Sequence, residues 1–224
     1  MCGIYGYIGN NGTAYEKVMS GLSLLQYRGY DSCGIAYFNN SFKVNKAVGT
    51  LNKLKPCEYK PNIAFGHTRW ATNGIVNETN AHPHISFNNE YTIVHNGIIK
   101  NADSIKKELI NKGISFYSQT DTEVIANYLT TIDIEKDLNK IYNDLEGSFS
   151  LIIGTSKGDI YLVKQFSPLH ILKTKNDIYI SSDISSLPEG ELYSLKDKDI
   201  IKIVNNFLIP FVVNCSHALC ILYS

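Results

Sequence analysis

The sequence lacks the features that mark several large classes of protein. Its 21 Lys and Arg residues are balanced by 21 Asp and Glu residues, so it lacks the excess positive charge that nucleic-acid binding through bulk electrostatics requires. It has no apolar run long enough to cross a bilayer, and its first residues lack the basic and apolar regions of a signal peptide. We therefore expect a cytoplasmic protein that has no membrane span, binds no nucleic acid and acts on a small molecule.

Signals for disulfides and metal sites are also scarce. The five cysteines are odd in number and include no C-x-x-C pair, which suits a reducing compartment. The six histidines include His82 and His84, but Pro83 fixes the backbone between them, and no cysteine or acid lies at ligand spacing. We predict a domain that folds without disulfides and holds no metal or other cofactor.

The apolar periodicity predicts a mixed fold with antiparallel sheets. Helices gather in the first two thirds of the chain and strands in the last third, with connections of hairpin length, which favours an α+β fold over a parallel doubly wound one. The third helix should begin at Thr120, where the run TDTE has the form of a capping box. Helices are expected near 15–25, 105–113, 120–129 and 134–145, and strands at 34–38, 63–67, 91–95, 148–154, 160–164, 178–182 and 200–204.

Cys2 is the most informative residue of the chain. If Met1 is removed, the same residue carries a thiol nucleophile and a free α-amino group, which titrates near pH ~8 and can take the thiol proton. Gly3 would let a substrate approach the backbone closely. The alternative is an incidental or buried cysteine near the terminus, and other segments must decide between the two.

Four segments place polar groups where a loop meets a strand or a helix. Taken together they describe a site for an α-amino acid with a side-chain amide: Arg69 would bind the carboxylate, and Asp121 the ammonium group. Asn96 and Gly97 would donate to the oxyanion that forms when Cys2 attacks. Taken singly, each segment has a plainer interpretation, as a surface turn, a cation–π pair, a β-turn or a helix-dipole partner. The segments are residues 27–32, 66–74, 94–97 and 118–121.

The same residues stand in runs that resemble the glutaminase domain of the glutamine–fructose-6-phosphate amidotransferases, which are class II, N-terminal-nucleophile glutamine amidotransferases. The runs occur in the family's order and cover most of residues 1–204. The purine-pathway members of the class would show an HRGQES-like run instead of YRGYDS. The matching runs are MCGI at 1–4, YRGYDS at 27–32, HTRWAT at 67–72, NAHPH at 80–84, VHNGII at 94–99 and TDTEV at 120–124, with weaker similarity at 146–149, 167–169 and 182–183.

The resemblance implies roles for the residues that would carry out the reaction. Cys2 resembles the nucleophile that forms a γ-glutamyl thioester and releases ammonia, with its own α-amine as the base. Asn96 and Gly97 resemble the oxyanion hole, and Arg28 resembles a residue that orders the N-terminal cysteine. The implied fold is the four-layer αββα sandwich of the N-terminal-nucleophile hydrolases.

The resemblance also implies how the substrate, L-glutamine, is held. Arg69 resembles the residue that binds the glutamine carboxylate, with Thr72 and His82 lining the same pocket. Asp121 resembles the residue that binds the ammonium group. Trp70 resembles a loop residue that closes over glutamine and helps to gate the passage of ammonia.

The chain departs from the family in three places. Asn73 stands where a histidine is common, and Lys164-Gln165-Phe166 stands where Arg-x-Gly is usual. The two sugar-isomerase domains that follow in the family have no counterpart here, so we expect a glutaminase domain at 2–206 and no synthesis of glucosamine 6-phosphate by this chain alone. The apolar tail at 207–224 has three interpretations: an edge strand, an interface to a separate sugar-isomerase synthase subunit, or an altered gene end.

Two other functions stay open at this stage. The first is a different N-terminal-nucleophile amidase or an amidotransferase with another acceptor, although Arg69 and Asp121 favour an amino-acid substrate. The second is a non-catalytic remnant that binds glutamine without hydrolysing it, since Asn73 and the tail are changes that a relaxed copy would show.

Overall fold

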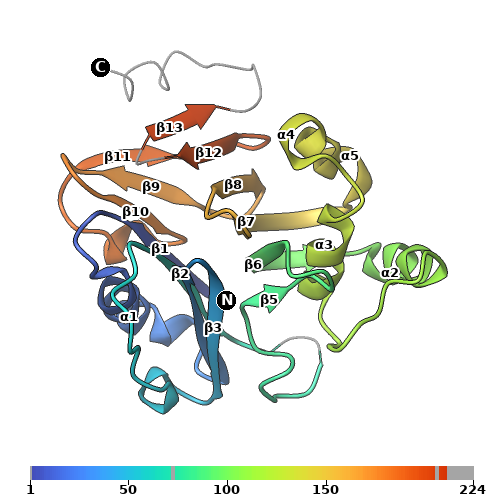
Figure 1. The fold of residues 1–224 in the computed structure, drawn as a ribbon, viewed down its shortest axis with the longest axis horizontal. Helices are drawn as coiled ribbons and strands as arrows, with labels where there is room; N and C mark the ends of the chain where they lie inside the picture. The colour runs from blue at the N-terminus through green and yellow to red at the C-terminus, as the bar shows by residue number, and fades with distance from the viewer. Residues whose placement is uncertain (1, 72–73, 205–206, 211–224) are drawn as a thin grey trace.

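The protein is a sandwich of two antiparallel sheets with helices on the outer faces (Figure 1). The computed structural model describes residues 2–71, 74–204 and 207–210. Helix α1 (Ala14–Leu24) packs on the seven-stranded sheet, and α3 (Asp121–Leu129) packs on the six-stranded sheet, with α2 (Ala102–Asn111) beside it. The predicted α+β, four-layer αββα architecture is therefore confirmed.

The two sheets are built from hairpins and longer crossovers. In order across the seven-stranded sheet lie β11 (Glu191–Ser194), β9 (His170–Lys173), β10 (Ile178–Ser181), β1 (Gly3–Ile8), β4 (Ile63–Arg69), β2 (Ser32–Asn39) and β3 (Ser41–Val48). The six-stranded sheet contains β13 (Phe207–Pro210), β12 (Ile200–Val204), β8 (Ile160–Gln165), β7 (Gly147–Thr155), β6 (Tyr91–Ile99) and β5 (His84–Ile85).

Three apolar clusters hold the layers together. The central cluster lies between the sheets and includes Ile4, Phe65, Val94 and Leu162, all almost completely buried. One outer cluster joins α1 to the seven-stranded sheet, and the other joins α3 to the six-stranded sheet. Because both faces of the inner strands are covered, each strand is fixed in register by two independent sets of contacts.

The helix that the sequence predicts at 120–129 is confirmed, and the one at 134–145 is divided. Thr120 caps α3 by accepting a hydrogen bond from the Glu123 amide, while the Glu123 carboxylate accepts from the amides of Tyr117 and Ser118. The apolar residues at 134–145 bury one face, but the chain turns between two short helices. These are α4 (Ile134–Asp137) and α5 (Ile141–Asp144), joined by a 3₁₀ turn at Leu138–Lys140.

The strand β1 is absent from the expectations drawn from the sequence. Every residue of β1 is buried, so the strand has no alternation of apolar and polar side chains, and its glycines weaken any propensity signal. β1 lies in the middle of its sheet between β10 and β4. The position matters because Cys2 directly precedes this strand.

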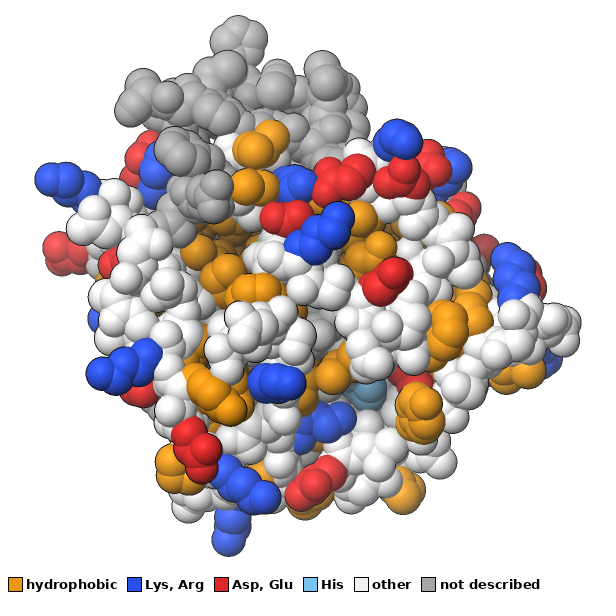
Figure 2. Space-filling view, viewed as in Figure 1, with side chains coloured by type: hydrophobic (Ala, Val, Ile, Leu, Met, Phe, Trp, Pro, Cys, Tyr) orange, Lys and Arg blue, Asp and Glu red, His pale blue; other side chains and the backbone are white. Residues whose placement is uncertain are grey.

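The distribution of charge on the surface agrees with the balanced composition of the sequence. Basic and acidic side chains are interspersed over the face drawn in Figure 2. No helix among the described residues is long and apolar enough to span a bilayer.

The last described strand, β13, pairs with β12 at the edge of the six-stranded sheet. Residues 211–224 lie outside the described residues, so the division at 206 between domain and tail stays a prediction.

Candidate active site

Cys2 lies where the ends of several central strands meet. Gly3 pairs with Thr68 in β4, so the chain before β1 runs beside the end of that strand. The Cys2 Sγ accepts a hydrogen bond from the Trp70 amide at 3.3 Å. A cavity of about 40 Å³ opens here, and its lining residues are Cys2, Arg69, Trp70, His82, His95, Gly97, Thr120, Asp121 and Thr122.

Opposing influences act on the Cys2 thiol. Burial raises its pKa, because the charged thiolate loses water. The Trp70 amide and the positive charges of Arg69 and Arg28 lower the pKa in turn. The thiol therefore needs a base to become a nucleophile. The predicted base is the α-amine freed by removal of Met1, a residue that lies outside the described part of the chain.

Asn96 and Gly97 lie on β6 beside Cys2, where the backbone conformation at Gly97 requires glycine. The Asn96 Nδ2 donates to the Cys2 carbonyl oxygen at 3.0 Å, which uses one of the two hydrogens of the amide. Gly97 has φ of +141°, and a Cβ there would lie 1.9 Å from the Ser148 carbonyl oxygen. Only glycine fits this position, so the backbone at Gly97 is free to approach the cavity.

The two charged groups predicted to bind substrate reach the cavity from different layers. Arg69 ends β4 and is 4% exposed, and burial lowers the pKa of its guanidinium while Cys2, Asp31 and Asp121 raise it. Asp121 begins α3, and its Oδ2 accepts a hydrogen bond from the Ile99 amide at 2.9 Å. The Asp121 side chain therefore links the start of α3 to the end of β6, and its negative charge also interacts favourably with the positive end of the helix dipole.

Four buried histidines lie close together beside the cavity, and two of them, His82 and His95, line it. The Thr122 hydroxyl contacts His82 Nε2 at 2.7 Å and His95 Nδ1 at 3.1 Å, and the rings of His67 and His82 stack at 4.1 Å. Burial lowers the pKa of all four rings, that of His67 to about 3. The members are His67, His82, His84 and His95, of which the sequence reasoning selected only His82 as a site residue.

The histidine group makes a prediction for stability at low pH. Because these rings stay neutral in the folded protein while the unfolded chain takes up protons below about pH 6.5, stability is lost as the pH falls from that value. Each such histidine should contribute about 1.4 kcal/mol per pH unit to the slope of the free energy of unfolding. Urea unfolding between about pH 6.5 and 4.5 measures the slope.

A single variant checks this assignment. His84→Gln keeps a polar partner for Thr120, which His84 Nε2 contacts at 3.0 Å. The variant should reduce the slope by about 1.4 kcal/mol per pH unit, because one proton fewer is bound on unfolding. An unchanged slope would mean that His84 is already protonated in the folded protein.

Trp70 stands at the mouth of the cavity. Its side chain is 44% exposed, and its ring makes an edge contact with Tyr30 at 5.7 Å between centroids. This exposure at the cavity edge is compatible with the predicted closing role. Thr72, which the sequence places in the same pocket, and Asn73 lie outside the described residues.

A larger cavity lies apart from Cys2. Its volume is about 690 Å³, and its walls come from β3, the 55–59 loop, the 78–89 segment and the start of α3. Its lining does not include Cys2, Arg69 or Asp121, so we place the chemistry in the smaller cavity, where those groups converge.

Lys46 on the wall of this larger cavity should titrate unusually low. Burial lowers the pKa of its ammonium group to about 8, although Glu123 and Glu78 raise it, and its Nζ donates to the Ala81 carbonyl at 2.9 Å. NMR titration should show one lysine with a midpoint near pH 8, and Lys46→Arg should remove that signal. Glu78→Gln should lower the midpoint further. A protein in which no lysine titrates below about pH 9.5 would contradict the prediction.

Comparison with known proteins points to one family. A family model described as a glutamine amidotransferase domain matches residues 67–189. Glutamine–fructose-6-phosphate aminotransferase [isomerizing] from Fusobacterium nucleatum is 36% identical over 218 residues, covering 92% of this chain and 36% of that protein. The enzyme of the same name from Helicobacter pylori is 43% identical over 203 residues, covering 84% and 33%. The chain thus spans about a third of the length of these relatives.

Solved structures agree on the fold. The glutamine phosphoribosylpyrophosphate amidotransferase from B. subtilis, complexed with ADP and GMP, superposes with a TM-score of 0.82 at 23% identity, covering 95% of this chain and 50% of that one. A structure described as the allosteric regulatory enzyme of purine biosynthesis gives a TM-score of 0.83 at 22% identity, with the same coverage. At these identities the likeness shows the fold alone.

Proposed function

The chain belongs to the glutamine amidotransferase domain family, and on that premise we propose that it hydrolyses the side-chain amide of L-glutamine to glutamate and ammonia. The observation that carries the proposal is the convergence of Cys2, Arg69 and Asp121 on one small cavity. These residues come from separate segments of the chain and include a nucleophile and two opposite charges. An α-amino acid offers the complementary carboxylate and ammonium groups.

The proposed reaction proceeds in two steps, the formation of a thioester and its hydrolysis. The Cys2 thiol gives its proton to the α-amine, and the sulfur attacks the amide carbon to form a tetrahedral oxyanion. Collapse of this intermediate breaks the C–N bond, transfers the proton to the leaving nitrogen and leaves a γ-glutamyl thioester with free ammonia. Water then attacks the thioester carbon, which releases glutamate and restores the thiol.

The surrounding residues supply binding and charge stabilisation. Arg69 pairs with the α-carboxylate, Asp121 pairs with the ammonium group, and His82 lines the same pocket. The free Asn96 amide hydrogen and the Gly97 backbone face the developing oxyanion. Because the cavity is only about 40 Å³, glutamine binding requires a wall to move outward, and Trp70 at its mouth is the candidate.

The fate of the ammonia depends on more than this chain. The relatives are named for an aminotransferase reaction with fructose 6-phosphate, and this chain spans about a third of their length. We propose that the chain supplies the glutaminase half-reaction of amino-sugar synthesis, with a sugar-isomerase synthase partner or domain providing the acceptor. We expect a cytoplasmic location.

The direct test is to incubate the purified chain with glutamine and to measure glutamate and ammonia, with mass spectrometry of the N-terminus. Turnover with glutamine, accompanied by loss of Met1, supports the proposal. Glutamine binding without turnover, in a chain with a free Cys2 amine, would favour a non-catalytic glutamine-binding protein. Turnover of other amides in preference to glutamine would favour a different N-terminal-nucleophile amidase.

A further inference from the structure

The start of β1 is fixed by the short segment that follows β10. The Ser182 amide donates to the Ile4 carbonyl at 3.1 Å, and the Ser182 Oγ accepts from the Ile4 amide at 3.0 Å. Both bonds act two residues from Cys2, on a strand that lies between β10 and β4. The segment at 181–186 thus sets the path of the backbone that carries the thiol.

The next residue in this segment, Asp183, forms an ion pair with Arg28. The Arg28 Nη1 lies 3.0 Å from the Asp183 Oδ2 and also reaches the Ser182 carbonyl at 3.4 Å. The Tyr27 hydroxyl donates to the same carboxylate oxygen at 2.5 Å. The side chains of Arg28 and Asp183 are 9% and 23% exposed, so this pair is better shielded from solvent than an ordinary surface ion pair.

The Asp183 carboxylate is itself held in place. Its Oδ1 accepts from the Ser185 amide at 3.0 Å and from the Ser185 hydroxyl at 2.8 Å, while its own amide donates to the Ser181 Oγ at 3.0 Å. The Tyr27 hydrogen bond and the Ser185 amide hold the pKa of Asp183 at about 2. The Asp183 carboxylate is therefore ionised at neutral pH and can pair with the positively charged Arg28.

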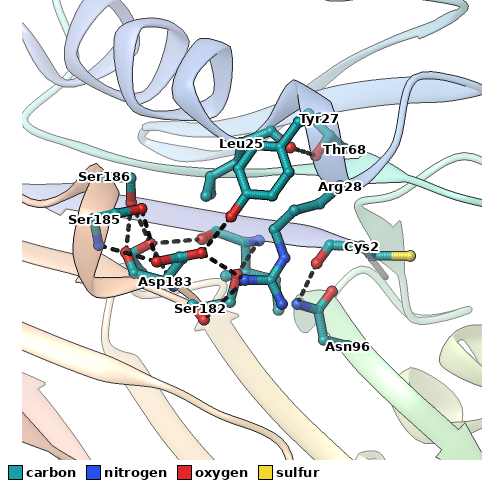
Figure 3. Close-up of polar contacts among 12 residues, drawn as sticks. Cys2, Leu25, Tyr27, Arg28, Thr68, Asn96, Ser182, Asp183, Ser185 and Ser186 are labelled. Atoms are coloured by element: carbon teal, nitrogen blue, oxygen red, sulfur yellow. Dashed lines mark hydrogen bonds and ion pairs between the residues drawn. The ribbon is translucent and has the colours of Figure 1, made fainter.

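We propose that Asp183 is a positioning residue for the nucleophile: its carboxylate holds the Arg28 guanidinium beside the start of β1, next to Cys2. Figure 3 shows Arg28 reaching from the 3₁₀ turn at Gln26–Arg28 toward Asp183 and Ser182, with Cys2 and Asn96 next to them. The charge of Arg28 is among the influences that lower the pKa of the Cys2 thiol against its burial. The inference rests on the proposed function, because it assumes that Cys2 is the nucleophile.

Removing the Asp183 charge has two effects of opposite sign, which makes the proposal testable. If Arg28 stays in place, loss of the nearby negative charge stabilises the thiolate and makes Cys2 more reactive. If Arg28 moves away, the thiolate loses its cation, and Cys2 becomes less reactive. The proposal requires the second outcome.

The experiment is the rate of Cys2 alkylation by iodoacetamide as a function of pH, followed by mass spectrometry of the Cys2 peptide. In Asp183→Asn the midpoint of the profile should rise, and the rate at neutral pH should fall about three- to tenfold. Arg28→Gln should shift the midpoint in the same direction. Cys2 in the double variant should be alkylated no more slowly than in Arg28→Gln alone, because both substitutions remove the same Arg28–Asp183 contact.

Matched variants and glutamine kinetics complete the test. Asp197→Asn, which breaks the Lys164–Asp197 pair, should leave the Cys2 profile unchanged. With glutamine, Asp183→Asn should lower kcat and shift its pH profile while KM changes little, since substrate binding is assigned to Arg69 and Asp121.

Several results would overturn the proposal. These are a lower midpoint in Asp183→Asn, an unchanged midpoint, or effects of Arg28→Gln and Asp183→Asn that add. If Asp183→Asn does not fold, an unchanged midpoint in Arg28→Gln overturns it as well. Alkylation needs no glutamine, so a chain without glutaminase activity would refute the proposed function separately from the role of Asp183.

Discussion

Replacing Cys2 with alanine should abolish glutamine hydrolysis, lowering turnover on the order of 10⁶-fold, as removal of the nucleophile does in other hydrolases. The structure gives no reason to expect unfolding. Cys2 precedes β1, and its side chain is only partly buried and bonds to the backbone of Trp70. Glutamate release, labelling by a glutamine-like electrophile and a thermal melt are the three measurements.

The matched control is another cysteine of the described chain. Cys57 is also a half-buried free thiol but lies outside the cavity around Cys2. Cys57→Ala should keep full activity. Comparable turnover in Cys2→Ala and the parent protein would refute the assignment of the nucleophile.

A blocked N-terminus should be nearly as damaging as the loss of the thiol. An extension that keeps Cys2 within a peptide bond converts its α-amine into an amide, which cannot accept a proton. Glutamine binding should survive in such a protein, because Arg69 and Asp121 are unchanged. A blocked chain with normal turnover would show that another group acts as the base.

The antiparallel sheets and helix α3 could be predicted because they depend on local patterns, whereas the four-layer arrangement was implied by the resemblance to the family. The capping residue Thr120 and the apolar face behind it mark α3, and the conformation of Gly97 requires a residue without a side chain. The polar residues at strand ends, with a cation at Arg69 and an acid at Asp121, suggest an α-amino acid as the substrate.

β1 and the side-chain pairs around the site escaped prediction because they depend on contacts between distant segments. β1 shows no polar alternation, because sheets and helices cover both of its faces. The bonds of Thr122 to His82 and His95 join residues 40 and 27 positions apart, and the Arg28–Asp183 pair joins residues 155 positions apart. No spacing in a sequence reveals such pairs, since the sheet order alone brings them together.

Asn96→Ala and Arg69→Ala should affect the reaction in opposite ways. Loss of an oxyanion donor typically lowers turnover about 10²–10³-fold, and we expect this for Asn96→Ala with little change in KM. If Arg69 binds the carboxylate as proposed, it does so equally in the ground and transition states, so Arg69→Ala should raise KM about tenfold to a hundredfold with a smaller effect on kcat. Arg69→Lys keeps the charge and should recover part of the affinity.

The Asn96 variant has a second explanation that the same experiment must separate. Because Asn96 Nδ2 also donates to the Cys2 carbonyl, its loss could lower turnover by displacing the nucleophile. Alkylation of Cys2 by iodoacetamide forms no oxyanion, so a true oxyanion donor leaves that rate near its parent value. Equal losses in alkylation and hydrolysis would make Asn96 a positioning residue, and a raised KM in Asn96→Ala with a low kcat in Arg69→Ala would mean that the two roles are exchanged.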